Sequence, residues 1–516
     1  MLIATGSTLL LIAVLLVAAH FLFRPPSLAG RSVSEAVRAS KATRLGRAVR
    51  LRFPHPNNSS GVVALRDGPE AFAARIAVIE AAEAALDVQY YIWQRDATGL
   101  ILLDELRRAA ERGVRVRLLL DDNGTRGLDA ELVALDALPN MEVRLFNPFI
   151  LRRPKALGFA FDFVRLNRRM HNKSLTADGA ISILGGRNIG NIYFGFGSGA
   201  QFIDTDVLVA AGAAADVGAD FDRYWHCASS HPVARIIGAP VAGAMESLIA
   251  DAAEARTSEE GRLYFGTLHS RNIIRRLEAG DERIEWTTVT LVSDDPAKGI
   301  GAAETRHLLF PQLMALRMTA ARSVDLVSAY FVPGKRFSRR LSALAQAGIR
   351  VRILTNSQAA TDVTVVHSAY VKYRPGLLRS GVALHELKPG FSVEDGPELR
   401  RRIGATVVSL HSKTLAIDGQ RIFIGSFNFD PRSMFLNTEM GVLIDSPQIS
   451  GSVADAFANR FQLTSYIPEL TRRGSIIWEE PQLDGQQIRH RTEPGTNPLS
   501  RLFVRALGIL PIEWLL

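Results

Sequence analysis

The sequence predicts an α/β protein with two related lobes, each a mostly parallel β-sheet flanked by helices, and an N-terminal transmembrane helix. Three observations support this prediction. One polar motif occurs in both halves of the chain, and the same strand–helix–strand order precedes each copy. An uncharged apolar stretch stands at the N-terminus. At 516 residues the chain has room for two or three domains.

The stretch from Leu2 to Phe23 contains no charged residue. As a helix it would span about 33 Å, enough for a bilayer core of about 30 Å. A cleaved signal peptide is the alternative, but the basic start and small-residue cleavage site of such peptides are missing. From Arg24 to Arg52 the chain carries many basic residues, and Glu35 is the one acidic residue among them. The positive-inside rule therefore places this flank and the following lobes in the cytoplasm, where the flank can contact anionic lipid.

The strand and helix patterns of the two halves correspond. The first half predicts a helix over residues 71–85, strands over 86–93 and 114–120, and a helix over 100–112 between them. The second half predicts strands over 324–332 and 349–354 around a helix over 337–347. Apolar strands that alternate with helices are typical of parallel sheets covered by helices.

These patterns divide the chain into five parts. They are a transmembrane anchor (1–24), a basic juxtamembrane linker (25–60), a first lobe (61–285), a second lobe (286–475), and a C-terminal arm with an amphipathic tail (476–516). Residues 256–280 are charged and weakly patterned, as expected of an inter-lobe connection. The tail, which ends near Trp514, either packs on the second lobe or lies at a membrane interface. Residues 149–163 form either a surface helix or a lip that touches acyl chains and phosphates.

The formal charge of +9 indicates an anionic partner, either lipid headgroups or nucleic acid. Aromatic residues make up only 8% of the chain and form no stacking platform with basic residues, which disfavours nucleic acid. The single cysteine, Cys227, excludes an intramolecular disulfide and a cysteine-based metal cluster. Two pairs of neighbouring aspartates, Asp121–Asp122 and Asp294–Asp295, could suggest a metal site. No histidine or glutamate accompanies them at ligand spacing, so we interpret them as strand-end turns.

The repeated motif combines groups suited to phosphoryl chemistry. It is MHNKSLTADGAISILGGRN at residues 170–188 and LHSKTLAIDGQRIFIGSFN at residues 410–428. An imidazole, with a usual pKa of about 6.5, can attack as a neutral nucleophile or transfer a proton. A lysine ammonium is a fixed positive charge for phosphate oxygens. The motif aspartates stand before glycine, as in tight turns.

This doubled His-x-Lys-x4-Asp pattern, with its downstream Gly and Asn, resembles the phospholipase D superfamily. The continuation GSFNFDPRSMFLNTEMGVLID (residues 425–445) is similar to the bacterial cardiolipin synthase and phosphatidyltransferase branch. The resemblance covers residues 60–516 and implies two pseudo-twofold related lobes that share one phosphate pocket, without cofactor or metal. It also implies a bacterial inner membrane as the location.

The resemblance assigns His171 as the nucleophile that forms a phosphohistidine and His411 as the acid and base, although the reverse stays open. It also gives the residues that bind phosphate oxygens, which are Lys173, Lys413, Asn188 and Asn428. Four further residues support the motif structure: Asp178, Asp418, Ser174 and Thr414. Arg187, Arg432 and Tyr193 are candidates to reach lipid headgroups.

A nucleophilic imidazole needs an acceptor on its other nitrogen. Glu439 matches the orienting carboxylate of the family. In the first half a Gly-rich insertion, residues 194–201, disturbs the spacing; alignment of the following strands gives Asp204, with Asp206 as second choice.

The function that the resemblance implies is a membrane-bound phosphatidyltransferase that makes cardiolipin from phospholipid substrates through a phosphohistidine. A phospholipid hydrolase of the same superfamily is the near alternative, because water can replace the acceptor alcohol. A nucleic-acid phosphodiesterase and a binding protein with a degenerate site are weaker alternatives. The expected partners are phospholipids and an anionic membrane surface; the sequence identifies no accessory protein.

Overall fold

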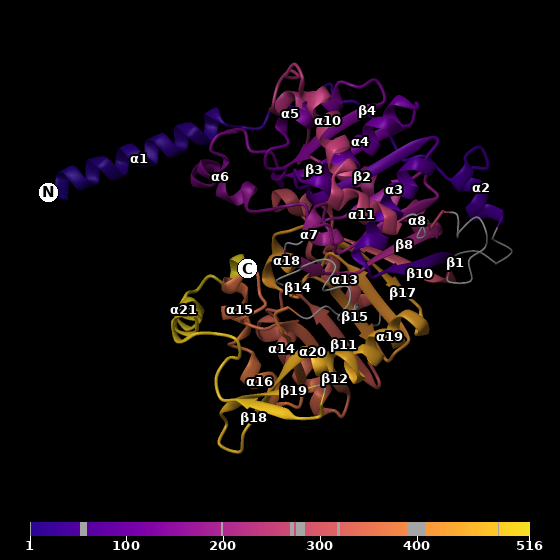
Figure 1. Cartoon of the computed structure of the whole chain (residues 1–516). Coiled ribbons are helices and arrows are strands. Elements are labelled where there is room, and N and C mark those ends of the chain that lie inside the picture. The colour runs from indigo at the N-terminus through magenta and orange to yellow at the C-terminus, as the bar shows by residue number, and fades with distance from the viewer. Residues whose placement is uncertain are drawn as a thin grey trace.

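The computed structural model describes residues 2–51, 59–197, 200–268, 273–274, 284–316, 320–390, 408–482 and 484–516. The two halves of the chain form two lobes that lie one above the other, and the long helix α1 (Leu2–Leu22) projects from one side (Figure 1). Of the predicted inter-lobe connection (256–280), residues 269–272 and 275–280 lie outside the described residues.

The first lobe is built on one mixed sheet. Its strand order is β1 (Ser59–Leu65), β8 (Asp206–Ala211), β6 (Ile181–Gly185), β5 (Ser174–Ala177), β2 (Ala85–Ile92), β3 (Arg115–Gly124), β4 (Met141–Phe146) and β9 (Ser230–Pro232). Most of these strands are buried, and helices cover them. The helices are α2 (Arg44–Leu51), α3 (Gly68–Ala81), α4 (Ala97–Glu111), α5 (Asp129–Asp136), α6 (Gly158–Leu166), α7 (Asn191–Phe194), α8 (Gly212–Trp225), α9 (Val233–Ile236), α10 (Ala244–Thr257) and α11 (Glu259–Leu268).

The second lobe repeats this pairing. Its strand order is β10 (Glu285–Ser293), β17 (Met440–Ile444), β16 (Arg421–Gly425), β15 (Lys413–Ile417), β11 (Ser323–Ser328), β12 (Arg350–Asn356), β13 (Ala383–Leu387), β18 (Ser465–Leu470), β19 (Ile476–Pro481) and β20 (Gln487–His490). Its helices are α13 (Leu309–Ala315), α14 (Gly334–Gln346), α15 (Thr364–Tyr370), α16 (Arg374–Arg379), α18 (Pro431–Phe435), α19 (Pro447–Ala458), α20 (Arg460–Thr464) and α21 (Pro498–Ile509). Antiparallel pairing of β1 with β10 joins both lobes into one 18-stranded sheet.

The predicted order of strands and helices is confirmed, but the prediction of mostly parallel sheets is wrong. Within the two sheets just described, β2-β3-β4 and β11-β12-β13 are the parallel parts. The remaining pairs are antiparallel because each motif folds back on itself as a hairpin, β5–β6 or β15–β16, and tight turns can join only antiparallel strands.

The two lobes share a hydrophobic core at their seam. Buried apolar side chains from β6 and β8 of the first lobe pack with those from β16 and β17 of the second, among them Leu184, Val207, Ile424 and Val442. The two short strands β7 (Gln201–Ile203) and β14 (Val408–Leu410) also pair in parallel across the seam. The relative position of the motifs is therefore fixed by backbone pairing and by burial.

Helix α1 leaves the body beside α6 (Figure 1). His20 Nδ1 lies 3.0 Å from the carbonyl oxygen of Phe161, and the Phe23 and Phe161 rings stack at 5.3 Å. Across the described ranges, no helix combines the length and hydropathy that a membrane crossing requires. The transmembrane span stays a prediction.

The segments at both ends of the chain pack on the lobes more closely than the sequence indicated. Arg31 of the basic flank donates to the carbonyl oxygens of Cys227 (2.9 Å) and Ser230 (2.8 Å), so this side chain is committed to the first lobe. At the other end, β19 and β20 extend the sheet of the second lobe, and α21 lies against α15. Exposed Phe503 and Trp514 face outward from the tail.

Candidate active site

Each motif copy places its histidine at the seam, just before the first strand of its hairpin. The backbone N–H of His171 donates to the carbonyl oxygen of Thr438 at 2.8 Å, and that of His411 donates to the carbonyl oxygen of Ile203 at 2.7 Å. The next residue along the chain carries a carboxylate in both cases: Glu439 follows Thr438, and Asp204 follows Ile203. The seam therefore sets a carboxylate of one lobe beside the histidine of the other.

Two histidine–carboxylate pairs cross the seam in opposite directions. His171 Nδ1 lies 2.8 Å from Glu439 Oε2, and His411 Nδ1 lies 2.5 Å from Asp204 Oδ2. All four side chains are buried. Because Nδ1 of each ring is held, Nε2 is the nitrogen left for chemistry. The family pattern predicted Glu439, and alignment of the following strands predicted Asp204. Neither indicated that each carboxylate would contact the histidine of the opposite lobe.

The two carboxylates differ by one methylene group, and the facing residues compensate for the difference. Glu439 accepts hydrogen bonds from the hydroxyls of Ser426 (2.5 Å) and Ser433 (2.7 Å). Gly186 holds the position of Ser426 in the first copy, and a Cβ there would lie 2.0 Å from Asp204 Oδ1. The Asp204 carboxylate lies so close to position 186 that only glycine fits there, whereas the Glu439 carboxylate leaves space for the Ser426 hydroxyl to donate a hydrogen bond.

Asp206, the second choice for the orienting carboxylate, has a structural role instead. It forms a buried ion pair with Arg75 at 2.8 Å and accepts the backbone N–H of Arg187 at 3.1 Å. The Arg187 guanidinium donates to the carbonyl oxygen of Leu65 at 2.7 Å and is buried. Arg187 is therefore committed to the first lobe and does not reach toward headgroups.

The motif lysines lie against the histidines of their own copies. Lys173 Nζ donates to the carbonyl oxygen of His171 at 2.6 Å, and Lys413 Nζ donates to that of His411. Both ammonium groups are almost fully buried. Two buried cations beside two imidazoles form a site for an anionic group.

The two motif asparagines differ in their surroundings. Asn188 Nδ2 donates to the Tyr193 hydroxyl at 2.9 Å, and its Oδ1 accepts the Ile92 N–H at 3.2 Å. Asn428 is buried, and its Oδ1 has no hydrogen-bond partner among the described residues. An unpartnered buried amide oxygen is costly, so the Asn428 side chain is the one poised to pair with a ligand.

Burial and neighbouring charges give the histidines different proton affinities. Burial lowers the pKa of His171 well below its usual value, and the charges of Lys173 and Lys413 lower it further. Burial and Lys413 also lower the pKa of His411, but the adjoining Asp204 opposes them. His171 is therefore the better neutral nucleophile, and His411 the better proton carrier.

The same forces act on the other charged groups. Burial lowers the pKa of Lys173 to about 7 and raises the pKa of Glu439 to about 7. Burial alone would raise the pKa of Asp204, but Lys413 and His411 hold it below its usual value. The Asp204 carboxylate is thus ionised at neutral pH, whereas Glu439 titrates there.

Comparison with known proteins identifies the family. The family model described as "Cardiolipin synthase, PLD-like domain" matches this chain twice, at residues 76–225 and 313–461. The chain belongs to this family of phospholipase D-like enzymes. Cardiolipin synthase C of Escherichia coli (strain K12) is 44% identical over 463 residues, which are 90% of this chain and 97% of the relative. Cardiolipin synthase of Geobacillus kaustophilus (strain HTA426) is 28% identical over 76% of this chain and 64% of the relative.

A solved structure has the same fold. Phosphatidylserine synthase of Haemophilus influenzae Rd KW20 aligns with 92% of this chain and 100% of its own, with a TM-score of 0.56 and 14% identity. This likeness supports the two-lobed α/β architecture for the cardiolipin synthase family member described here.

The residues expected to support the motif have identifiable contacts. Asp178 and Asp418 stand in the hairpin turns with φ values of 53° and 57°, and their carboxylates accept backbone N–H groups at the starts of β2 and β11. Ser174 accepts a hydrogen bond from Gln89 Nε2 at 3.0 Å. Thr414 lines a small pocket behind the second histidine.

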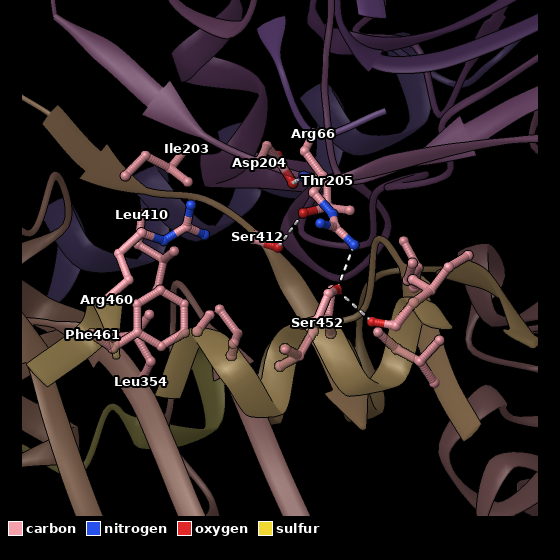
Figure 2. Close-up of a pocket in the computed structure, with 17 residues that line it drawn as sticks. Arg66, Ile203, Asp204, Thr205, Leu354, Leu410, Ser412, Ser452, Arg460 and Phe461 are labelled. Carbon is pink, nitrogen blue, oxygen red and sulfur yellow. Dashed lines mark hydrogen bonds between the residues drawn. The ribbon is translucent and has the colours of Figure 1, made fainter. Parts of the chain in front are cut away.

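Figure 2 shows this pocket, which lies between the lobes behind Asp204. The Ser412 hydroxyl donates to Thr205 Oγ1 at 3.1 Å, and Arg66 of the first lobe donates to the Ser452 hydroxyl of the second. These contacts hold Asp204 in register with the second motif.

The sequence analysis missed two carboxylates that position the site. Asp121, at the end of β3, accepts the backbone N–H of Met170 at 2.7 Å and pairs with Arg169 at 2.8 Å. Asp294, after β10, accepts the N–H of Glu439 at 2.9 Å. In the sequence both follow directly after a predicted buried strand, a position that is also typical of turn residues.

Two of the aromatic side chains around the imidazoles, Tyr91 and Phe202, were not predicted from the sequence, and Tyr193 was predicted only as a candidate for headgroup contact. The Tyr91 ring lies 4.9 Å from His171, and the rings of Tyr193 and Phe202 lie 5.3 and 5.0 Å from His411. Phe202 follows the Gly-rich insertion, of which residues 198–199 lie outside the described residues. Arg432, a candidate for headgroups, instead donates to the carbonyl oxygen of Asn167 at 2.8 Å across the seam.

Proposed function

We propose that this chain is a membrane-bound phosphatidyltransferase that makes cardiolipin through a covalent phosphohistidine. The observation that supports it most strongly is the pair of crossed contacts, His171 with Glu439 and His411 with Asp204. Identity of 44% to an Escherichia coli cardiolipin synthase over most of the chain agrees with it. In this proposal the site residues predicted from the sequence have the roles described below.

In the first step His171 Nε2 attacks the phosphorus of a phospholipid. The bond from phosphorus to the headgroup oxygen breaks, and His411 donates its proton to that oxygen. Glu439 holds Nδ1 and stabilises the positive charge on the ring, as the carboxylate of a serine triad does. The lowered pKa of His171 favours it as nucleophile, and the ionised Asp204 favours a proton on His411.

In the second step the hydroxyl of an acceptor lipid attacks the phosphohistidine. His411 takes the hydroxyl proton, the new oxygen–phosphorus bond forms, and the bond from phosphorus to His171 breaks. With phosphatidylglycerol as the acceptor the product is cardiolipin. Both histidines then hold the protons with which they began.

The charge that develops on phosphorus is stabilised by donors already in place. Lys173 and Lys413 supply positive charge, and the Nδ2–H groups of Asn428 and the second N–H of Asn188 supply hydrogen bonds. A closed site also favours transfer over hydrolysis, since His171 and His411 are only 6% and 5% exposed.

The proposal includes a location in a bacterial inner membrane. Helix α1 would anchor the chain, with residues 1–24 as the anchor, residues 25–60 at the cytoplasmic membrane surface and both lobes in the cytoplasm. Helices α6 and α21 lie on the side of the molecule from which α1 projects (Figure 1). Both carry exposed apolar side chains, such as Val164 and Phe503. This side would face the bilayer and receive lipid substrates.

The test is lipid analysis of a bacterial strain that lacks cardiolipin and expresses this chain. Cardiolipin should accumulate with the native chain and disappear with His171→Ala or His411→Ala, each checked for stable expression in the membrane fraction. Accumulation of phosphatidic acid without cardiolipin would instead indicate a hydrolase. No lipid change from a folded, membrane-bound protein would contradict the proposal.

A further inference from the structure

A second basic cavity lies in the first lobe, outside the histidine site. It has a volume of about 950 Å³ and lies between the loop after β3 and the segment that leads into α6. Its charged and aromatic walls are formed by Arg126, Arg152, Arg153, Lys155, Phe149 and Phe159, together with Asp129. The cavity is large enough for a phospholipid headgroup.

Two of the four basic side chains already have acidic partners. Arg152 pairs with Asp122 at 2.5 Å and with Asp129, and Lys155 pairs with Asp122 at 2.9 Å. These pairs fix the shape of the wall and neutralise its inner part.

The other two basic side chains, Arg126 and Arg153, are exposed, and neither forms an ion pair within the described ranges. Their charge is therefore available to a ligand. Guanidinium groups favour the paired oxygens of a phosphate because they donate two parallel hydrogen bonds.

The cavity is also lined by apolar rings that continue onto the exposed face of α6. The Phe149 and Phe159 rings meet edge to face at 5.4 Å, and Phe159 contacts Phe163 at 6.3 Å. Phe163 and Val164 of α6 are exposed. A ligand that matches both walls is amphipathic, with an anionic head at the arginines and an apolar tail along α6.

The cavity adjoins the histidine site at the shared edge of two parallel strands. Asn123, which lines the cavity, precedes Gly124, and Gly124 pairs with Ile92, the residue after Tyr91; the Tyr91 ring lies 4.9 Å from His171. β2 and β3 pair directly, and neighbouring strands lie about 4.8 Å apart. The cavity wall at Asn123 is therefore one strand away from the Tyr91 ring that contacts His171.

We propose that this cavity binds the phosphodiester group of the acceptor phospholipid while the donor phosphorus is held by the histidines and lysines. This inference rests on the proposed function. Cardiolipin contains two phosphodiesters joined by a short glycerol bridge, so an anionic acceptor brings a second phosphate that does not react. Arg126 and Arg153 bind that phosphate, and the glycerol hydroxyl extends past Tyr91 to the phosphohistidine.

The experiment measures how the phosphohistidine is divided between two acceptors. Purified full-length enzyme in mixed micelles of phosphatidylglycerol receives deuterated glycerol as a competing acceptor that has no phosphate. Mass spectrometry then gives the ratio of cardiolipin to deuterated phosphatidylglycerol. Because both products arise from one intermediate, the ratio reports acceptor binding alone.

The variant Arg126→Gln/Arg153→Gln should lower this ratio about tenfold or more, the scale of losing charge-assisted hydrogen bonds to phosphate. Transfer to glycerol should persist. The matched control Arg472→Gln/Arg473→Gln, in the exposed turn between β18 and β19, should keep the native ratio.

An unchanged ratio in a folded Arg126→Gln/Arg153→Gln variant would overturn the inference. That includes a loss of both products in equal proportion, which would mean that the arginines only attract the membrane or assist the donor. If the native enzyme forms neither product, the proposed function itself fails, and the acceptor site fails with it.

Discussion

Replacing Gly186 by alanine should disable the site through a single steric contact. The new Cβ would lie 2.0 Å from Asp204 Oδ1, whereas ordinary contacts begin at 3.4 Å. The Asp204 carboxylate must then move by about 1.4 Å, the difference between these two distances. A shift of this size is large enough to lengthen the present 2.5 Å contact with His411 beyond the limit of about 3.2 Å for a hydrogen bond.

The expected cost follows from the role of that contact. Removing the orienting carboxylate of a serine triad lowers kcat by about 10⁴, and a misplacement of 1 Å can cost about 10². We therefore expect Gly186→Ala to lower kcat by a factor of about 10² to 10⁴. Overpacking should lower the free energy of unfolding by about 1–3 kcal/mol, which leaves the protein folded.

The assay is cardiolipin formation by purified protein, with urea unfolding as the measure of stability. Gly376→Ala is the matched control, since a Cβ at that exposed position in α16 meets no atom within 4 Å. It should keep native kcat, with stability equal to the native value or higher by up to about 1 kcal/mol, since alanine favours a helix over glycine. A folded Gly186→Ala enzyme with native kcat would refute the role assigned to Asp204.

Three further predictions follow from the site and the N-terminus. The kcat/KM should peak near pH 7. Activity should fall at lower pH because Glu439, with a pKa of about 7, gains a proton, and at higher pH because Lys173, with a pKa of about 7, loses its charge. In a pH–rate profile the Glu439→Gln variant should therefore lose the decrease on the acid side. Arg169→Met should destabilise the fold by about 3–5 kcal/mol in urea unfolding, because it leaves Asp121 buried and unpaired. Deletion of residues 1–24 should release the protein from membranes during alkaline carbonate extraction.

Each of these predictions has a control or a contradicting outcome. Lys173→Arg, whose charge is permanent, should shift the alkaline limb to higher pH. Arg306→Met breaks an exposed pair with Glu304 and should cost at most about 1 kcal/mol. A flat pH profile, equal costs for Arg169→Met and Arg306→Met, or unchanged membrane retention after deletion would contradict the respective argument.

Much of the site could be predicted because it repeats. The doubled motif identified His171, Lys173, His411 and Lys413, and the structure brings all four to one seam. The strand order also repeats, so its elements were predictable from apolar periodicity.

The rest depends on contacts that spacing within one motif cannot show. Glu439 lies close in sequence to His411, yet it pairs with His171, because the lobes face each other across the seam. In sequence Asp121 resembles an ordinary strand-end residue; only the structure shows that its carboxylate accepts a hydrogen bond from the Met170 N–H. The antiparallel half of each sheet was missed because buried strands look alike in sequence whichever way their neighbours run.

The most direct test of the account is the position of the covalent intermediate. Enzyme mixed with phospholipid and quenched rapidly in cold denaturant at mildly alkaline pH, which preserves both the phosphohistidine and the acyl esters, can be digested and analysed by peptide mass spectrometry. The account predicts a phosphatidyl mass on the peptide that contains His171. The same mass on the His411 peptide would reverse the two roles, and its absence from both during active turnover would contradict the covalent mechanism.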